Sequence, residues 1–178
     1  VGKNLQDHLM FRPVYKVKNL KSLNKKINSL FGNFLIALEY IFNQSGPMTM
    51  GASQVCGFAK SDNSRETPNL QFHVQPISTD ILGATKLHDF DGITPTVANI
   101  RPTSRGEINI VSNNIKDYPK IKMNYLSTDD DRYVAAQGLK LIRKIMLETE
   151  IFKKYEPKEY RPGLHIQDDE ELVKAGSD

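Results

Sequence analysis

The sequence contains few of the features that would assign a chemistry directly. Cys56 is the single cysteine among 178 residues, so we expect no internal disulfide, and the chain is compatible with a reducing cytoplasm. No Cys and His pairs stand at metal-ligand spacing, and we expect no metal site. The apolar run that comes closest to a membrane span, residues 34–42, contains Glu39 and falls short of the roughly 20 residues required. We therefore expect no membrane span.

Common nucleotide-binding and nucleophile motifs are also missing. The sequence contains no Gly-x-Gly-x-x-Gly turn and no Gly-x-x-x-x-Gly-Lys loop, which hold phosphates at the start of a helix. It contains no Gly-x-Ser-x-Gly nucleophile elbow. By motif alone, the chain is either a binding domain or an incomplete part of an enzyme.

The charge and composition are those of an ordinary folded domain. The residues are 39% hydrophobic and 25% charged, and 24 basic against 21 acidic side chains give a net charge of +3. The basic residues form no stripe with interleaved aromatics, so we expect no nucleic-acid partner. The densest basic stretch, residues 16–26, is interpreted as a solvated face.

Both ends of the sequence are abrupt. The chain starts at Val1 without an initiator Met or a targeting segment. It stops shortly after residues 168–174, whose leading carboxylates are typical of the first turns of a helix. We expect the chain to be an excerpt of a longer protein.

The first half of the chain predicts a strand, a helix and a sheet. Residues 9–17 suit a strand, although Pro13 favours an edge or a bulge there. Apolar residues spaced by three and four predict a helix over 20–43 with one broad buried face. Gly32 weakens the middle of this helix, so two shorter helices are the alternative. Three further strand-like runs, expected to share one sheet, are residues 53–60, 69–75 and 94–101.

The second half predicts a strand pair and a strong helix. Residues 96–101 and 107–111 flank a loop containing Gly106, which predicts that they pair antiparallel. Residues 113–125 are rich in loop formers, and Ser127 is expected to cap the helix that follows. The apolar stripe expected on that helix is Val134, Leu141, Ile142, Ile145 and Met146. The pattern predicts an α+β fold, with a mainly antiparallel sheet flanked by helices.

Histidine supplies the candidate acid–base groups. Of the four histidines, His73 is the most informative because it lies in a strand-like run, where Leu70, Phe72 and Val74 would point to one face and His73 to the other. That second face lines a polar cleft or faces solvent, and the sequence leaves both alternatives open. Adjacent Asp7 and His8 would point in opposite directions, so we expect no dyad between them.

Several short segments together resemble one enzyme family. They occur in order over essentially the whole chain and are residues 1–9 (VGKNLQDHL), 54–58 (QVCGF), 68–73 (PNLQFH), 101–106 (RPTSRG), 119–121 (PKI) and 124–127 (NYLS). In this order they resemble the glucose-methanol-choline (GMC) oxidoreductases, and within them the choline and primary-alcohol dehydrogenases.

The resemblance implies FAD as cofactor and oxidation of a small-molecule alcohol to an aldehyde by hydride transfer to the flavin. It implies that residues 1–178 form a substrate-binding domain, with 1–9 as the junction from the flavin domain and 101–178 as the start of the C-terminal region. The Rossmann fingerprint would then lie before Val1 and the catalytic His after Asp178. We expect no catalytic residue in this chain and expect it to bind no FAD and to be inactive by itself.

The same resemblance implies site residues. His73 matches a position that lines the active site in choline-oxidising members, and Gln54 one where they often carry Glu. Because a neutral Gln does not attract a quaternary ammonium, an uncharged alcohol is as good a candidate substrate as choline. Asn4, Asp7 and His8 match a segment near the flavin cleft, with cofactor-side contact and structural anchoring as alternatives.

Two other interpretations accompany this resemblance. Arg105 and Gly106 are expected to shape a loop, because Gly permits a tight reversal and Arg can hold a loop by hydrogen bonds. The rival to the enzyme hypothesis is a non-enzymatic α+β binding or interaction domain, in which the face bearing His73 is solvated or binds a protein.

Overall fold

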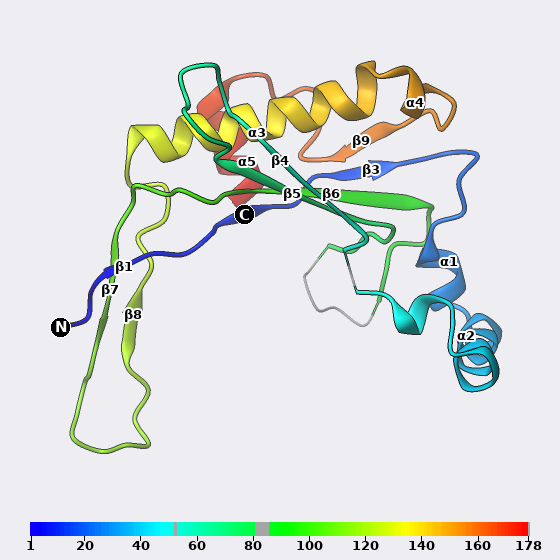
Figure 1. The fold of residues 1–178 in the computed structure, drawn as a ribbon, viewed down its shortest axis with the longest axis horizontal. Helices are drawn as coiled ribbons and strands as arrows, with labels where there is room; N and C mark the ends of the chain where they lie inside the picture. Colours follow the sequence, from blue (N-terminus) through cyan, green and yellow to red (C-terminus); the bar gives the residue numbers. More distant parts are fainter. Residues whose placement is uncertain (52, 81–85, 178) are drawn as a thin grey trace.

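Two antiparallel sheets organise the chain (Figure 1), whose computed structural model describes residues 1–51, 53–80 and 86–177. In the larger sheet the strand order is β4-β5-β6-β3-β9, and β2 also pairs with β6. Its strands are β2 (Met10–Phe11), β3 (Val14–Lys16), β4 (Val55–Ala59), β5 (Leu70–Gln75), β6 (Gly92–Asn99) and β9 (Lys158–Arg161). The smaller sheet, in the order β1-β7-β8, contains β1 (Lys3–Leu5), β7 (Gly106–Asn109) and β8 (Lys120–Lys122).

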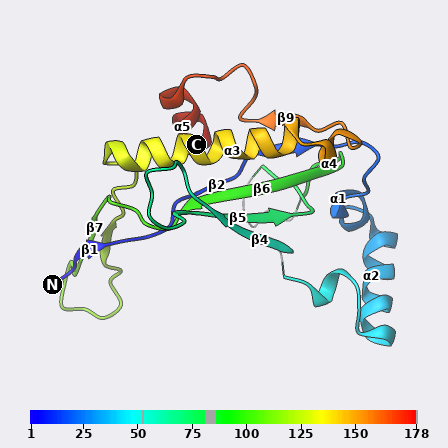
Figure 2. The same cartoon turned by 45° about the horizontal axis from the view of Figure 1, so that its top comes forward.

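The helices flank the larger sheet, as the sequence predicts for an α+β fold. Helix α3 runs across one face of the sheet with α5 beside it, while α1 and α2 lie beyond the ends of the strands (Figures 1 and 2). The helices are α1 (Leu23–Ile27), α2 (Leu30–Asn43), a 3-10 turn (Pro47–Thr49), α3 (Asp129–Glu148), α4 (Glu150–Lys153) and α5 (Asp169–Ser177). Within the described ranges, none of these helices has the length and apolar character needed to cross a bilayer.

The core lies between α3 and the larger sheet. Val134, Ile142 and Met146 of α3 are buried in one cluster with Leu70, Val97 and other apolar residues, which confirms most of the predicted stripe. Gly138 permits the close approach, because a Cβ atom there would lie 2.9 Å from a Val97 methyl group. Ile145, which we expected in the stripe, is 38% exposed, and the helix is capped by Thr128 rather than Ser127.

The predicted sheet of three strands is present, and a strand interrupted by proline extends it. Strands β4, β5 and β6 are consecutive neighbours. The predicted strand over 9–17 is divided into β2 and β3 around Arg12 and Pro13, yet both parts keep the same register against β6. By that register Pro13 faces a second proline, Pro95. Because neither residue has an N–H group to donate, the ladder of hydrogen bonds is interrupted at this point, although the strand forms no bulge against β6.

The predicted pairing of residues 96–101 with 107–111 is wrong. Strand β7 pairs instead with β1 and β8, so it belongs to the smaller sheet, and β8 lies within residues expected to form only a loop. The chain leaves the larger sheet after β6 because residues 103 and 104 turn their backbone N–H groups toward Asp131 on α3. A long-range hydrogen bond, which a local pattern does not reveal, decides the partner of β7.

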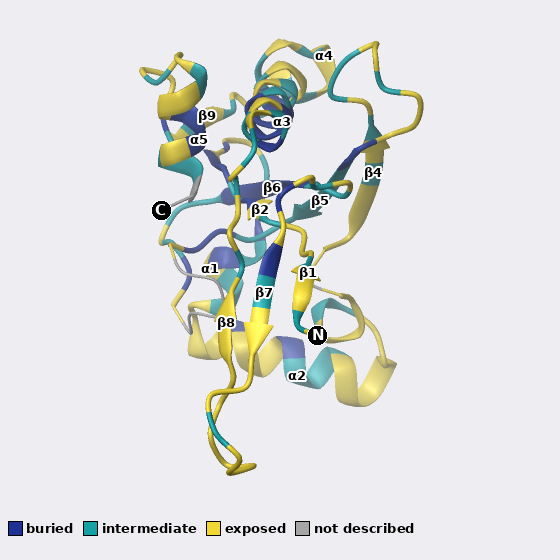
Figure 3. Cartoon of the chain, turned by 90° about the vertical axis from the view of Figure 1, so that its left-hand side faces the viewer, coloured by how far each residue is buried: buried dark blue, intermediate teal, exposed yellow. Residues whose placement is uncertain are grey.

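The predicted helix over 20–43 is two helices, and its broad buried face is not found. The break falls at Asn28 and Ser29 rather than at Gly32, because the Ser29 side chain accepts a hydrogen bond from Gly32 N and starts α2. Of the residues of α2 only Gly32 and Ile36 are buried. Leu30 is 90% and Phe42 is 77% exposed, and α2 is largely in the exposed colour in Figure 3.

Asp131 ties the start of α3 to the loop that follows β6. Its carboxylate is almost fully buried and accepts hydrogen bonds from the backbone N–H groups of Thr103 and Ser104, both at 2.8 Å. It also accepts from the Thr103 hydroxyl and from the side-chain amide of Asn99. Burial alone would raise the pKa of Asp131, but these hydrogen bonds outweigh it and leave the pKa below its ordinary value.

We predict that Asp131→Asn lowers the free energy of unfolding by about 2–4 kcal/mol at neutral pH, because an amide N–H would face backbone donors. The native-state pKa is below the unfolded value of about 3.9, so the carboxylate stabilises the fold above that pH and the contribution is lost as pH falls through the native pKa. Urea unfolding of both proteins between pH 7 and pH 3 measures the difference, which should shrink with acid.

The matched control is Asp129→Asn, which removes the same charge from the same helical turn at a side chain that is 98% exposed. We expect it to change stability by less than about 1 kcal/mol. Equal losses in the two variants would show that helix-end charge, rather than the buried hydrogen bonds, is what Asp131 contributes.

Candidate functional site

His73 lies on the face of the larger sheet that α3 does not cover. Leu70 and Phe72 of the same strand pack into the core on the α3 side, as their alternation with His73 predicts. His73 pairs with Cys56 on β4 and with Thr96 on β6, and it is half-buried. Figure 2 shows α3 along one side of these strands. His73 therefore belongs to a partly accessible surface, which we call the open face.

Gln54 lies on the same open face, immediately before β4. It is exposed, and by alternation its side chain shares the side of Cys56. Its side-chain nitrogen donates to the sulfur of Met50 at 3.0 Å. By register it stands diagonally across from His73, at a separation of roughly 7–8 Å. The structure thus brings together the two residues predicted to contact substrate.

The open face is polar and contains no acidic side chain among its described residues. By alternation and cross-strand pairing, its charged side chains are Arg12, which follows β2, Lys16 of β3 and Lys158 of β9, and all three are basic. The other members on β2, β4, β5 and β6 are Met10, Gln54, Cys56, Phe58, Gln71, His73, Gln75, Thr94, Thr96 and Ala98, of which Thr94, Thr96 and Ala98 are buried. This surface can donate and accept hydrogen bonds, but it offers no negative charge.

A second region, the junction cleft, contains Asp7 and His8. The cleft is open to solvent and combines residues before β2 with the loop after β6. Its lining residues are Gln6, Asp7, His8, Ile100, Arg101, Pro102, Thr103 and Arg105. Two guanidinium groups, an imidazole and an amide make this set rich in donors, which suits an anionic group.

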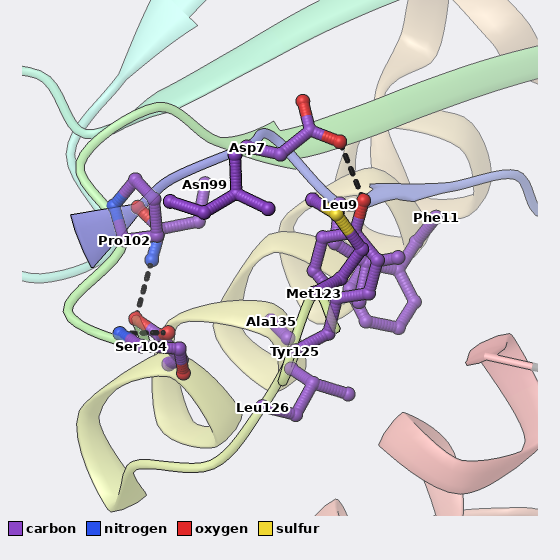
Figure 4. A pocket seen from close by; sticks show the side chains of 12 residues that line it. Asp7, Leu9, Phe11, Asn99, Pro102, Ser104, Met123, Tyr125, Leu126 and Ala135 are labelled. Atoms are coloured by element: carbon purple, nitrogen blue, oxygen red, sulfur yellow. Dashed lines mark hydrogen bonds between the residues drawn. The ribbon is translucent and has the colours of Figure 1, made fainter. Parts of the chain in front are cut away.

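Asp7 is held in place by Tyr125, which does not itself line the junction cleft. Its carboxylate accepts a hydrogen bond from the hydroxyl of Tyr125 at 2.5 Å (Figure 4). That bond, with help from the backbone N–H of His8, lowers the pKa of Asp7. The same bond, with burial, raises the pKa of Tyr125 to about 12. The pair fixes the segment before β2 against residues 123–126.

The pocket beneath this pair is too small for a substrate. Figure 4 shows Leu9, Phe11, Met123 and Leu126 around it. Its volume of about 20 Å³ is room for about one water molecule. We therefore regard it as packing beneath the junction cleft rather than as a binding site.

Asn4 lies apart from Asp7 and His8. It belongs to β1, with a φ of 64° in the left-handed region that Asn tolerates better than most residues. Its surroundings include Gly106, Lys122 and Asn124, and Arg105 borders both this region and the junction cleft. The guanidinium of Arg105 donates to the carbonyls of residues 102 and 104, as expected for a residue that holds a loop.

The open face and the junction cleft follow one another along β6. If the register of β2 against β6 is extended by two residues, His8 stands level with Ile100, whereas His73 pairs with Thr96. The separation along the strand is therefore about 13 Å. The structure places Gln54 with His73, and Asp7 with His8, at neighbouring parts of one surface.

This surface suits binding and orientation of a ligand. The imidazole of His73 and the amide of Gln54 can hydrogen-bond a hydroxyl group, and the junction cleft can contact an anion. Over the described ranges, no three side chains of His, Cys, Asp or Glu converge in a way that would hold a metal ion.

Sequence reasoning missed Arg12 and Tyr125. A signal for Arg12 exists, since it alternates with His8 and Met10 in a strand whose next residue is proline. Tyr125 lies 118 residues from Asp7, and no local pattern connects the two.

Comparisons with known proteins identify relatives of the whole chain. Residues 102–177 match the family model described as GMC oxidoreductase. The chain is 32% identical over 172 residues to the oxygen-dependent choline dehydrogenase of Pectobacterium atrosepticum and 33% identical to that of Vibrio vulnificus. Each match covers 97% of this chain and 30% of the relative, so the chain spans about a third of the length of these curated relatives. The predicted resemblance is confirmed.

Solved structures share the fold. A formate oxidase superposes with a TM-score of 0.83 at 20% identity, covering 99% of this chain and 35% of that protein. A FAD-dependent oxidoreductase from Chaetomium thermophilum superposes with a TM-score of 0.74 at 17% identity, covering 98% of this chain and 36% of that protein. These matches confirm the predicted α+β architecture.

We predict that Tyr125→Phe raises the pKa of Asp7 toward its ordinary value, because the phenol hydroxyl is the largest cause of its depression. An NMR titration of the Asp7 carboxyl carbon measures the shift. Tyr118→Phe is the control, since Tyr118 is 91% exposed, and it should leave the titration of Asp7 unchanged. An unchanged Asp7 titration in Tyr125→Phe would contradict the pairing.

Proposed function

Since this chain is a relative of the GMC oxidoreductases, we propose that it is the substrate-binding part of a longer FAD-dependent enzyme that oxidises an alcohol to an aldehyde. In this proposal residues 1–9 are the junction from a flavin domain, and residues 101–178 are the start of the C-terminal region. The observation that carries the proposal is the open face, where Gln54, just before β4, stands diagonally across from His73 of β5, while the other face of these strands packs toward α3.

His73 and Gln54 are the proposed substrate contacts. A half-buried imidazole on a rigid strand can hydrogen-bond the substrate hydroxyl and fix its orientation, which is a large part of what a binding surface contributes to rate. Gln54 is a neutral neighbour that can bond a second polar group. The proposed role of this chain is to hold and orient the alcohol, and we assign no proton acceptor to its residues.

The junction cleft is the proposed cofactor side. FAD, when bound, supplies the acceptor for the hydride and carries a pyrophosphate. The donor set of the cleft fits such an anion, with His8 as the proposed contact beside Arg101. Asp7, whose carboxylate is bonded to Tyr125, would position this segment rather than touch a phosphate. Asn4 would contribute at the far side of Arg105.

Choline and an uncharged alcohol are the two proposed candidate substrates. The relatives named above are choline dehydrogenases, which favours choline. Against it, Gln54 carries no charge, and no described side chain of the open face is acidic. We propose a cytoplasmic location, which the free and exposed Cys56 supports.

The second candidate function is a non-enzymatic interaction domain. It is favoured by the exposed apolar surface of α2, where Leu30, Phe31, Phe34, Ile41 and Phe42 are each more than half exposed. The two candidates differ in what the full-length protein contains, since the interaction domain requires neither a flavin nor an alcohol.

The purified full-length protein should carry a flavin absorbance spectrum that bleaches when an alcohol is added without oxygen.

We predict that His73→Gln lowers kcat/KM by about 10- to 100-fold through loss of one hydrogen bond to the substrate, with flavin content unchanged. Choline and its uncharged isostere 3,3-dimethylbutan-1-ol are the paired substrates, and Gln54 predicts little preference for the charged one.

His165→Gln is the matched control, because His165 is an exposed loop residue. It should retain full activity. A protein without flavin that oxidises no alcohol would favour the interaction domain. An active flavoprotein in which His73→Gln and His165→Gln behave alike would remove His73 from the site.

A further inference from the structure

Arg12 stands at the same level of the sheet as His73. The register of β2 and β3 against β6 places Arg12 beside Thr96, and Thr96 pairs with His73 on its other side. The two Cα atoms are therefore two strand spacings apart, roughly 10 Å. Alternation with Met10 puts the Arg12 side chain on the open face, and its terminal nitrogen donates to Gln75 Oε1 at 3.2 Å.

The charge of Arg12 has no counter-ion among the described residues. Its one hydrogen bond in that part of the chain goes to a neutral amide, and its Nε atom is buried without a partner. Arg65, Arg132, Arg143 and Arg161 each pair with a carboxylate. Arg101 and Arg105 also lack a described carboxylate partner, but both are exposed to solvent, whereas Arg12 is partly buried. Burial lowers the pKa of Arg12, with no acid to oppose that effect.

Such an arrangement is costly unless something compensates for it. A partly buried guanidinium retains its charge at any physiological pH, so it cannot avoid the desolvation penalty by losing a proton. Neighbouring groups do not supply the compensation, because Gln71, Gln75, Thr96 and His73 are neutral or weakly basic. An anion placed on the open face would supply it.

We propose that Arg12 is a substrate-recognition residue and that the alcohol oxidised at this face carries a carboxylate group. This inference rests on the proposed function and names its substrate class. A guanidinium offers two parallel N–H donors that match the two oxygens of a carboxylate. With the carboxylate on Arg12, the hydroxyl end of a short hydroxy acid reaches toward His73.

The face as a whole supports an anion over a cation. Arg12 repels a quaternary ammonium, and Gln54 offers it no attraction. The competing explanation is that a carboxylate from another part of the longer protein pairs with Arg12. In that case Arg12 would stabilise the folded full-length protein, and replacing it would lower activity equally for every substrate.

The test uses the full-length flavoprotein with a matched pair of substrates, 4-hydroxybutanoate and butan-1-ol, which share a carbon chain and differ in the carboxylate. Wild-type protein should favour 4-hydroxybutanoate. Arg12→Gln should lower kcat/KM for 4-hydroxybutanoate by about 10- to 100-fold, mainly through KM, because one charge-assisted contact is lost. It should change kcat/KM for butan-1-ol by less than about 3-fold, and Arg12→Lys should restore part of the loss.

Lys144→Gln is the control for net charge, because Lys144 is an exposed residue of α3. It should leave both substrates unaffected. A second measurement does not depend on turnover: calorimetric titration of wild-type protein and Arg12→Gln with butanoate, which should bind the wild type and lose affinity about 10-fold or more in the variant.

The outcomes separate the two proposals. A protein that oxidises no alcohol yet binds butanoate through Arg12 would overturn the proposed function and retain the anion site. A wild-type enzyme that oxidises butan-1-ol or choline as well as 4-hydroxybutanoate and does not bind butanoate would overturn the role of Arg12. If Arg12→Gln loses activity equally for both substrates, Arg12 is a structural residue. The same conclusion follows if Arg12→Gln does not fold and the wild-type protein does not bind butanoate.

Discussion

The hydrogen bonds to the buried Asp131 carboxylate determine where the junction cleft lies. They hold the loop after β6 against the first turn of α3, at the point where the chain leaves the larger sheet. Arg101 and Thr103 of the junction cleft lie in that loop. The same turn carries β7 into the smaller sheet, where it pairs with β1 and so holds the segment that leads to Asp7 and His8. One buried carboxylate therefore positions both walls of the cleft.

The sequence predicts the elements well because their information is local. Alternation in residues 70–74 assigns the correct faces to Leu70, Phe72 and His73, and the spacing of Val134, Ile142 and Met146 identifies the core side of α3. The partner of β7 is not local. It depends on Asp131 reaching residues 103 and 104, and no pattern in residues 96–111 encodes that contact. Pairing by proximity in sequence therefore gave the wrong sheet.

The residues of the candidate site also differ in whether local sequence patterns reveal them. Gln54 and His73 were found from the resemblance and meet on one face because β4 and β5 are adjacent strands. Arg12 was missed, because a basic residue before a proline is typical of an edge strand that faces solvent. Only the unbroken register across Pro13 places it beside Thr96, inside the sheet. Helix α2 gives the converse error: its apolar spacing indicates residues that need cover, but the described part of the chain supplies little of it.

The two faces of the larger sheet differ in their contribution to the stability of the fold. On the α3 side, close packing around Gly138 and the buried apolar cluster supplies stability. On the open face, His73 is half-buried and Arg12 has a buried nitrogen without a partner, which costs stability in the chain as it stands. Residues that are unfavourable for the fold and grouped on one rigid surface are typical of binding sites, because the ligand supplies the missing contacts. Since α3 packs against the core side of β5 and β6, the backbone that presents the open face is held by contacts that do not involve the side chains of that face.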